Sequence, residues 1–314
     1  MKRKLAYLLA CIALLAAACS KPAGDRQPIY VFTDSAGKQV NIYEAPRRVA
    51  VLLASYAEIW KISGGEIAVT VGDSVERGFA DGTAELVDGG AGMNIDVEKL
   101  AALRPDFVIG SADMPAQVAA CERLGATGIP CALFKEETFG DYLYMLKIFS
   151  DINGNADAYY EYGQAVGVKI ADILSEAEEN AAADEVSVLF IRAGSGGSST
   201  RAKTAENHFV GVMLKELGTF NIADEAKQLS EALSLEHVLI KQPDVILIST
   251  QGDEQAAVSY MTDVLSEPGW RELRAVKYGK VYFLPKNMFH YKPNALWGDA
   301  YAYLYDLLYG EGVA

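Results

Sequence analysis

The stretch that decides the fold is Asp96-Val97-Glu98, followed after six residues by Pro105-Asp106-Phe107-Val108-Ile109, because it occurs twice. The second copy is Ser234-Leu235-Glu236, followed after six residues by Pro243-Asp244-Val245-Ile246-Leu247. Every position is offset by 138 residues (236 − 98 = 243 − 105 = 138). Each copy has the pattern of an N-cap, an amphipathic helix, a proline that ends it and a buried strand. Copies this far apart predict two similarly built lobes rather than a short-period solenoid, and paired lobes commonly enclose a ligand in a cleft.

The N-terminal residues have the features of a targeting signal. Three basic residues (2–4) precede an apolar run over 5–15, and small residues lead into Cys19. This order looks like a bacterial lipobox, although Leu15 stands four rather than the usual three residues before the cysteine. It predicts a signal peptide over 1–18, a lipid on Cys19 and an extracytoplasmic, membrane-anchored chain. An ordinary secretory signal or an uncleaved anchor are the alternatives, but the run is shorter than the roughly 20 residues that span a bilayer.

The length and the composition indicate two domains. Residues 19–28 are small and polar and predict a flexible lipidated tether. We expect an N-terminal lobe over 29–140, a connecting helical segment over 141–182 and a C-terminal lobe over 183–314. With 51% hydrophobic residues, each lobe can bury a core. Without the three basic residues of the signal, the formal charge falls from −14 to −17, which argues against nucleic acid as a partner.

Short apolar runs alternate with helical patterns in both halves. This alternation predicts an α/β fold with a parallel, doubly wound sheet in each lobe. The expected strands cover 49–53, 68–71, 107–109, 131–134, 186–191, 245–248 and 280–284. The expected helices cover 57–63, 97–103, 115–124, 209–217, 235–241 and 295–308.

One long helix is expected between the lobes, over 155–180. This stretch has no proline, and apolar residues recur at steps of three and four from Tyr159 to Ala177. At 1.5 Å per residue such a helix is roughly 40 Å long, enough to run along both lobes. A single helical connector predicts that the lobes move little relative to one another.

Three stretches resemble one family. They are TDSAGKQVNI (33–42), the paired Glu…Pro-Asp segments and PGWRELRAVKYGKVYFLP (268–285). All look like the extracytoplasmic solute-binding proteins of ABC importers for ferric siderophores, haem and cobalamin. The resemblance covers nearly the whole mature chain and implies two Rossmann-like lobes joined by one long backbone helix. It also implies a monomer that binds a metal chelate, needs no cofactor, and works with a permease and its ATPase subunit.

The same resemblance implies a role for Glu98 and Glu236. In the family, one glutamate per lobe, seven residues before the Pro-Asp pair, docks into basic pockets of the permease. An acid in the first turn of a helix is also favoured by the helix dipole, by about 0.3–1 kcal/mol, without any partner. Equivalent positions on equivalent lobes favour docking.

Ligands of doubly wound sheets bind outside the carboxyl ends of the strands. This rule selects eight residues as ligand contacts: Tyr56, Ser74, Ser111, Lys135, Arg192, Ser195, His290 and Tyr291. Aromatic rings offer flat contact to a macrocycle or catecholate, and an arginine offers a forked contact to an anion. Each of them could equally have a structural role, and we expect Trp270 and Trp297 to be structural. The Gly194–Ser198 loop lacks both phosphate-loop spacings, and we expect it to be flexible.

Direct binding of a bare metal ion is not expected. A transition-metal site needs several converging imidazoles or carboxylates, and only three histidines exist: His208, His237 and His290. His290 could instead ligate a haem or corrinoid metal. Cys121 and Cys131 are expected to be two separate buried thiols, with a disulfide as the alternative in this compartment.

The alternative to a binding protein is a lipid-anchored GDS-type hydrolase. Gly72-Asp73-Ser74 follows an apolar strand, as in such esterases. Its serine would need a base from a C-terminal Asp-x-x-His, but Asn287 stands three residues before His290. The sequence therefore favours a non-enzymatic receptor.

Overall fold

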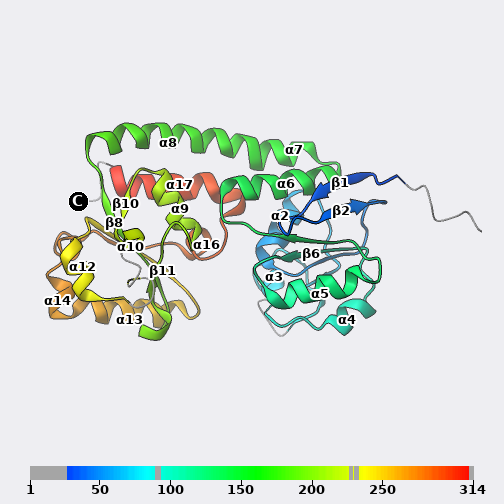
Figure 1. Ribbon diagram of the computed structural model, residues 1–314, viewed down its shortest axis with the longest axis horizontal. Coiled ribbons are helices and arrows are strands. Elements are labelled where there is room, and N and C mark those ends of the chain that lie inside the picture. Colours follow the sequence, from blue (N-terminus) through cyan, green and yellow to red (C-terminus); the bar gives the residue numbers. More distant parts are fainter. Residues whose placement is uncertain (1–26, 89–92, 226–228, 230–232, 311–314) are drawn as a thin grey trace, which may run out of the picture.

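The computed structural model describes residues 27–88, 93–225, 229 and 233–310. Figure 1 shows two α/β lobes side by side beneath one long helix. The signal peptide expected over 1–18 and the lipid site at Cys19 lie outside the described residues. Within the described part, no helix is long and apolar enough to cross a membrane.

The N-terminal lobe contains a parallel sheet in the order β5-β4-β3-β6-β7. Its strands are β3 (Val49–Val51), β4 (Val69–Thr70), β5 (Glu85–Leu86), β6 (Phe107–Ser111) and β7 (Cys131–Phe134). Its helices are α2 (Ala54–Ile62), α3 (Gly72–Glu76), α4 (Val97–Ala102) and α5 (Pro115–Gly125). An antiparallel hairpin of β1 (Tyr30–Thr33) and β2 (Gln39–Ile42) was not expected, and Phe32 of this hairpin stacks on Phe134 with ring centroids 6.0 Å apart.

The C-terminal lobe repeats this architecture with the order β10-β8-β11-β12, all parallel, while β9 pairs antiparallel with β8. Its strands are β8 (Ser187–Ala193), β9 (Arg201–Ala202), β10 (Phe220–Asn221), β11 (Val245–Thr250) and β12 (Val281–Phe283). Its helices are α9 (Phe209–Glu216), α10 (Ile222–Glu225), α12 (Leu235–Lys241), α13 (Glu254–Ser266), α14 (Pro268–Arg271), α15 (Arg274–Lys277), α16 (Lys286–Phe289) and α17 (Trp297–Tyr309). The predicted α/β class with parallel sheets is confirmed.

The duplicated segment recurs in the backbone itself. Leu100 of α4 and Val238 of α12 are both fully buried, and they are 138 residues apart (238 − 100). Arg104 and Gln242, shortly after the two helices, have the same spacing (242 − 104 = 138) and the same left-handed conformation, with φ of 48° and 46°. Each is followed by the proline that cannot continue the helix.

The aspartate of each Pro-Asp pair connects neighbouring strands. Asp106 accepts hydrogen bonds from the backbone N–H groups of Arg47 and Arg48, at 2.8 and 2.9 Å, just before β3. Asp244 accepts one from the backbone N–H of Ser187, at 3.0 Å, at the start of β8. The repeat therefore sets the register of the central strand pair in each lobe.

The connecting segment is helical almost throughout. It contains α6 (Phe139–Asn153), then α7 (Ala156–Tyr159), a π-helical turn (Tyr160–Gln164) and α8 (Ala165–Ala183) without interruption. The helix expected over 155–180 thus runs from Ala156 to Ala183. The π-helical turn packs closely on α6 at Gly163, where an added Cβ would lie 2.7 Å from Leu143 Cδ1, so a larger residue there would require Leu143 to move.

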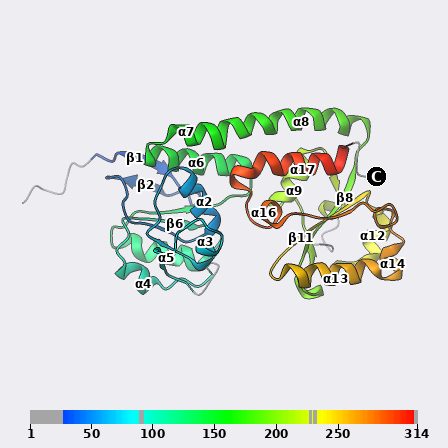
Figure 2. The ribbon, with the colours of Figure 1, turned by 180° about the vertical axis from the view of Figure 1, so that it is seen from behind.

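The hydrophobic core is shared between the lobes. The largest buried cluster contains Phe134 and Phe149 from the N-terminal side and Phe190, Trp297 and Leu304 from the C-terminal side. Two further clusters cover the outer face of each sheet. Seen from behind, α17 lies between α8 and the C-terminal lobe (Figure 2). The lobes therefore meet through packed helices rather than through a flexible tether.

The two cysteines of the N-terminal lobe are both free and buried. Cys121 lies on α5, and Cys131 is the first residue of β7. This agrees with two buried thiols.

Candidate functional site

Three predicted ligand contacts are buried. Tyr56 is 2% exposed, and its hydroxyl donates to the carbonyl oxygen of Phe134 at 3.0 Å, so its ring belongs to the core. Ser74 is fully buried on α3, and Ser111 is 4% exposed. All three follow strand carboxyl ends, as expected, but they point inward.

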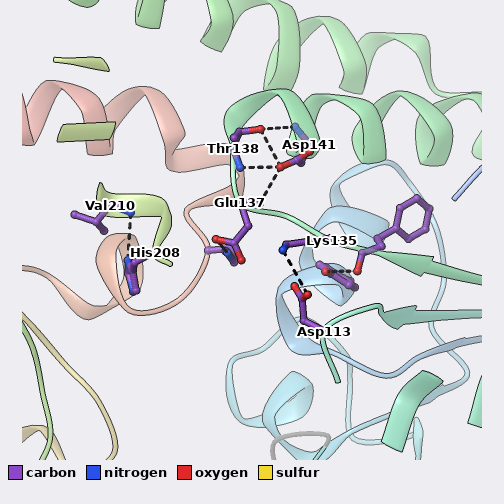
Figure 3. Close-up of polar contacts among 10 residues, drawn as sticks. Asp113, Lys135, Glu137, Thr138, Asp141, His208 and Val210 are labelled. Carbon is purple, nitrogen blue, oxygen red and sulfur yellow. Dashed lines mark hydrogen bonds and ion pairs between the residues drawn. The ribbon is translucent and has the colours of Figure 1, made fainter. Parts of the chain in front are cut away.

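Two other predicted contacts remain accessible. Lys135 is half exposed and pairs with Asp113 at 3.7 Å, both on the N-terminal lobe (Figure 3). Ser195 is exposed in the glycine-rich loop after β8. That loop contains hydrogen bonds, such as the one from Thr200 Oγ1 to the carbonyl oxygen of Gly196 at 2.9 Å.

His290 is near both Arg192 and Tyr291: the charge of Arg192 acts on its imidazole, and its ring centroid lies 4.8 Å from that of Tyr291. Arg192, the next-to-last residue of β8, is half-buried, its Nε has no hydrogen-bond partner among the described residues, and burial lowers the pKa of its guanidinium. Burial, followed by the positive charges of Arg192, Lys286 and Arg77, lowers the pKa of His290 to about 4. His290 is therefore a neutral imidazole, and its Nδ1 also lacks a partner in the described part of the chain.

Arg77, which the sequence analysis missed, brings the N-terminal lobe to this group. Its guanidinium carbon lies 3.9 Å from the centroid of the Tyr291 ring and 4.7 Å from that of Phe79. Asp73, one turn earlier, is 3.6 Å away. The available signal was its place just after the Gly72-Asp73-Ser74 segment that follows β4.

Lys292 makes a second connection across the lobes. Its Nζ lies 3.3 Å from a carboxylate oxygen of Glu137 and 4.9 Å from the centroid of Phe209 on α9. Figure 3 shows Glu137 between His208 on one side and the Lys135–Asp113 pair on the other. Glu137 follows β7, so the pair joins that strand end to the C-terminal lobe.

A buried carboxyl group lies beside this connection. Glu136 is 1% exposed, and neither of its carboxylate oxygens has a hydrogen-bond partner among the described residues. Burial raises the pKa of Glu136 to about 8, although the positive charge of Lys292 and the indole of Trp297 act in the opposite direction. Burial also raises the pKa of Glu58, which contacts the same C-terminal segment through Asn294.

The two predicted docking glutamates lie on the surface. Glu98 and Glu236 are exposed in the first turns of α4 and α12. Both helices lie on the side of the molecule away from α8 (Figure 1).

The open cavities of the described residues lie elsewhere. One of about 630 Å³ is lined by residues of α9, β10 and α10, and one of about 750 Å³ lies along α8. No predicted ligand contact lines either of them. Across 27–88, 93–225 and 233–310, no three His, Cys, Asp or Glu side chains are placed to hold a metal ion.

The structure is that of a two-lobed binding protein. It has two α/β lobes with parallel sheets, a long connecting helix and a group of cations where the lobes meet. The model of the family described as "Periplasmic binding protein" matches residues 49–288. The chain belongs to this family.

Individual relatives and structures agree with the fold. The chain is 25% identical to the ABC transporter substrate-binding lipoprotein YvrC of Bacillus subtilis, over 88% of this chain and 87% of that protein. It is 23% identical to the molybdate-binding protein MolA of Haemophilus influenzae, over 62% of this chain and 57% of that protein. The crystal structure of Staphylococcus aureus SirA with staphyloferrin B matches with a TM-score of 0.65 and 17% identity, over 88% of this chain and 96% of that chain.

The buried carboxyl group predicts how stability depends on pH. The folded pKa of Glu136, about 8, is above its ordinary 4.5, so the folded chain keeps a proton that the unfolded chain releases. The resulting stabilisation is complete below about pH 4.5 and is lost as the pH rises through about 8, by up to about 1.4 kcal/mol per pH unit. Glu136→Gln should flatten this decline and stabilise the protein at pH 8.

Urea unfolding at pH 5 and pH 8 measures this, with Glu122→Gln on the exposed face of α5 as the control. Equal loss of stability in wild type and Glu136→Gln would assign the pH dependence to other groups.

Proposed function

We propose that this protein is the substrate-binding component of an ABC importer and that it captures a metal chelate of the iron-siderophore, haem or cobalamin type. The ligand lies between the lobes, against Arg192, His290 and Tyr291. The observation that carries the proposal is the half-buried guanidinium of Arg192, near a strand end of the C-terminal lobe, whose Nε has no hydrogen-bond partner among the described residues. A buried cation without a partner is costly, and a bound ligand would supply what is missing.

The relatives support this class of function. YvrC is named as an ABC transporter substrate-binding lipoprotein, and SirA was crystallised with the siderophore staphyloferrin B. His290 adds a second argument, because a neutral imidazole with a partnerless nitrogen can ligate the metal of a planar chelate.

The hydrolase alternative gains no support. Ser74, its only candidate nucleophile, is fully buried, and within the described residues its hydroxyl has no hydrogen-bond partner that could act as a base. We therefore propose a receptor without catalytic activity.

A bare oxyanion is the second candidate ligand. MolA is named as a molybdate-binding protein, and an arginine binds an oxyanion as readily as it binds the acidic group of a chelate. The two candidates differ in whether iron or cobalt must be present.

Thermal unfolding with added ligands tests the function. We expect at least one of ferric staphyloferrin B, ferric enterobactin, haem and cobalamin to raise the melting temperature of the full mature chain. At 100 times Kd, a ligand stabilises by about 2.7 kcal/mol. A shift with molybdate alone would favour the oxyanion, and no shift with any of these compounds would refute the proposed function.

Delivery is proposed to depend on Glu98 and Glu236. Both are exposed, and they occupy equivalent places on the two lobes, so basic pockets of a permease could receive them together. The double variant Glu98→Ala, Glu236→Ala should keep ligand affinity within about twofold and lose most ligand uptake. Glu254→Ala, another exposed acid in the first turn of a helix, is the matched control. Wild-type uptake by the double variant would exclude the docking role.

Anchoring is proposed at Cys19, from the basic, apolar and small residues that precede it. Cys19→Ser should leave an unprocessed precursor or release the protein from membranes, as measured by fractionation and mass spectrometry. A processed Cys19→Ser protein that stays with the membranes would contradict a lipid at this position.

A further inference from the structure

The pairing of β8 with β9 carries an inference about the chemical class of the ligand, which rests on the proposed function. We propose that Arg192, Arg201 and Lys203 form one anion-binding site, and that the ligand presents at least two negatively charged oxygens to it. Arg201 and Lys203 lie outside the residues that sequence reasoning selected.

The two arginines are direct partners across the antiparallel pair. Arg192 of β8 is opposite Arg201 of β9, next to the pair Ile191 and Ala202. Side chains of directly opposite residues share one face of a sheet, with Cβ atoms about 4.5–5.5 Å apart. Like charges in this position destabilise the strand pair. Two arginine side chains thus leave the backbone from neighbouring positions on one face, at a cost to the empty protein.

Lys203 extends the same face. Its backbone N–H donates to the carbonyl oxygen of Phe190 at 2.9 Å, so it continues the pairing beyond β9. Since side chains alternate along a strand, Lys203 lies on the face of Arg201. Burial, followed by the charges of Arg192 and Arg201, lowers the pKa of Lys203, the direction expected for neighbouring cations on one face.

These three cations lack acidic partners, in contrast to three other cations near the boundary between the lobes. Over 27–88, 93–225 and 233–310, no carboxylate oxygen lies within 4.0 Å of the side-chain nitrogens of Arg192, Arg201 or Lys203. The three other cations are paired, Arg77 with Asp73, Lys135 with Asp113 and Lys292 with Glu137. In a chain with a formal charge of −14, an unpaired cationic group of this kind indicates an external anion.

The site is also held in place before a ligand binds. Nη1 of Arg201 donates to the carbonyl oxygens of Gly197 and Thr200, at 2.6 and 2.7 Å. Within the described part of the chain these bonds use only Nη1, so its other guanidinium nitrogens can donate to a ligand. Gln251 closes the loop on the β11 side by donating to the carbonyl oxygen of Ser199.

A neutral imidazole, that of His208, lies near the cations. The backbone N–H of Val210 donates to His208 Nδ1 at 3.2 Å (Figure 3), which leaves the proton of the neutral ring on Nε2. Burial, and then Arg192, Lys292, Lys203 and His290, lower the pKa of His208. The charges in the site therefore come from guanidinium and ammonium groups, whose geometry suits carboxylate and oxo groups.

Calorimetric titration with defined probes tests the site. We expect wild type to bind ferric citrate, an anionic carboxylate chelate, more tightly than ferrioxamine B, a chelate without carboxylates, with affinity that falls as salt rises. Lys203→Gln and Arg201→Gln should each weaken the affinity for ferric citrate roughly ten- to hundredfold. Arg123→Gln, on the exposed face of α5, is the control and should change nothing. Molybdate in a parallel arm distinguishes a bare oxyanion from a chelate.

Stability without ligand gives a second readout. Lys203 makes no side-chain hydrogen bond among the described residues, so Lys203→Gln removes charge repulsion and the cost of burying part of an ammonium group, and should raise the melting temperature of the empty protein. A lowered melting temperature with unchanged affinity would overturn the anion site.

The outcomes also separate this inference from the proposed function. Tight ferrioxamine B or cobalamin binding, unaffected by Lys203→Gln and Arg201→Gln, would leave the function standing and refute the anion site. A second outcome is that the protein binds molybdate or citrate but no metal chelate, and that both variants abolish this binding. That outcome would support the anion site and refute the chelate function.

Discussion

The structure depends on one side chain of the returning C-terminal segment, the amide of Asn294. It is fully buried, with a left-handed φ of 51°, and its Nδ2 donates to the carbonyl oxygen of Ser55 at 2.9 Å and to Glu58 Oε2 at 2.7 Å. A hydrogen bond to a charged group contributes about 1.5–3 kcal/mol. Because these contacts join the C-terminal segment to α2, the neighbouring residues Tyr291 and Lys292 reach Arg77 and Glu137 of the N-terminal lobe. The first turn of α17 is thereby positioned under α8.

That constraint explains why large lobe movements are not needed for the proposed function. The main core cluster is continuous from the N-terminal sheet through α6 and α17 to the C-terminal sheet. Lys169 of α8 also pairs with Asp299 of α17 at 2.5 Å, and Asn180 donates to the Tyr305 hydroxyl at 3.0 Å. Such a frame holds the two sides of the site at a nearly fixed spacing. Ligand capture then depends on charge and on side-chain rearrangement more than on hinge closure.

The sequence predicted what local patterns determine. The duplicated segment located α4, β6, α12 and β11, because caps, prolines and apolar periodicity lie within a dozen residues. The β1–β2 hairpin was missed because each of its strands is only four residues long, and α13 was missed because only Ala257 and Met261 of it are buried. The rule for strand ends located Tyr56 after a strand, as observed, but it did not predict that the side chain points into the core. That orientation is fixed by the contact with Phe134, a residue far away in the sequence. Contacts such as Arg77 with Tyr291 depend on distant segments and leave no local signal.

The distribution of unsatisfied polar groups then indicates where function lies. Among the described residues, partnerless buried atoms include Arg192 Nε, His290 Nδ1, the carboxylate of Glu136 and Trp297 Nε1. An unsatisfied buried group costs about 1–3 kcal/mol, so a fold keeps several of them in one region only when something else completes them. Some belong to the region where the C-terminal segment meets the N-terminal lobe, and Arg192 belongs to the cationic face of β8 and β9. A neutral ligand could satisfy the histidine and the indole, but it would leave three like charges unbalanced. An anion compensates the cations, and the same compensation offsets the repulsion built into the strand pair.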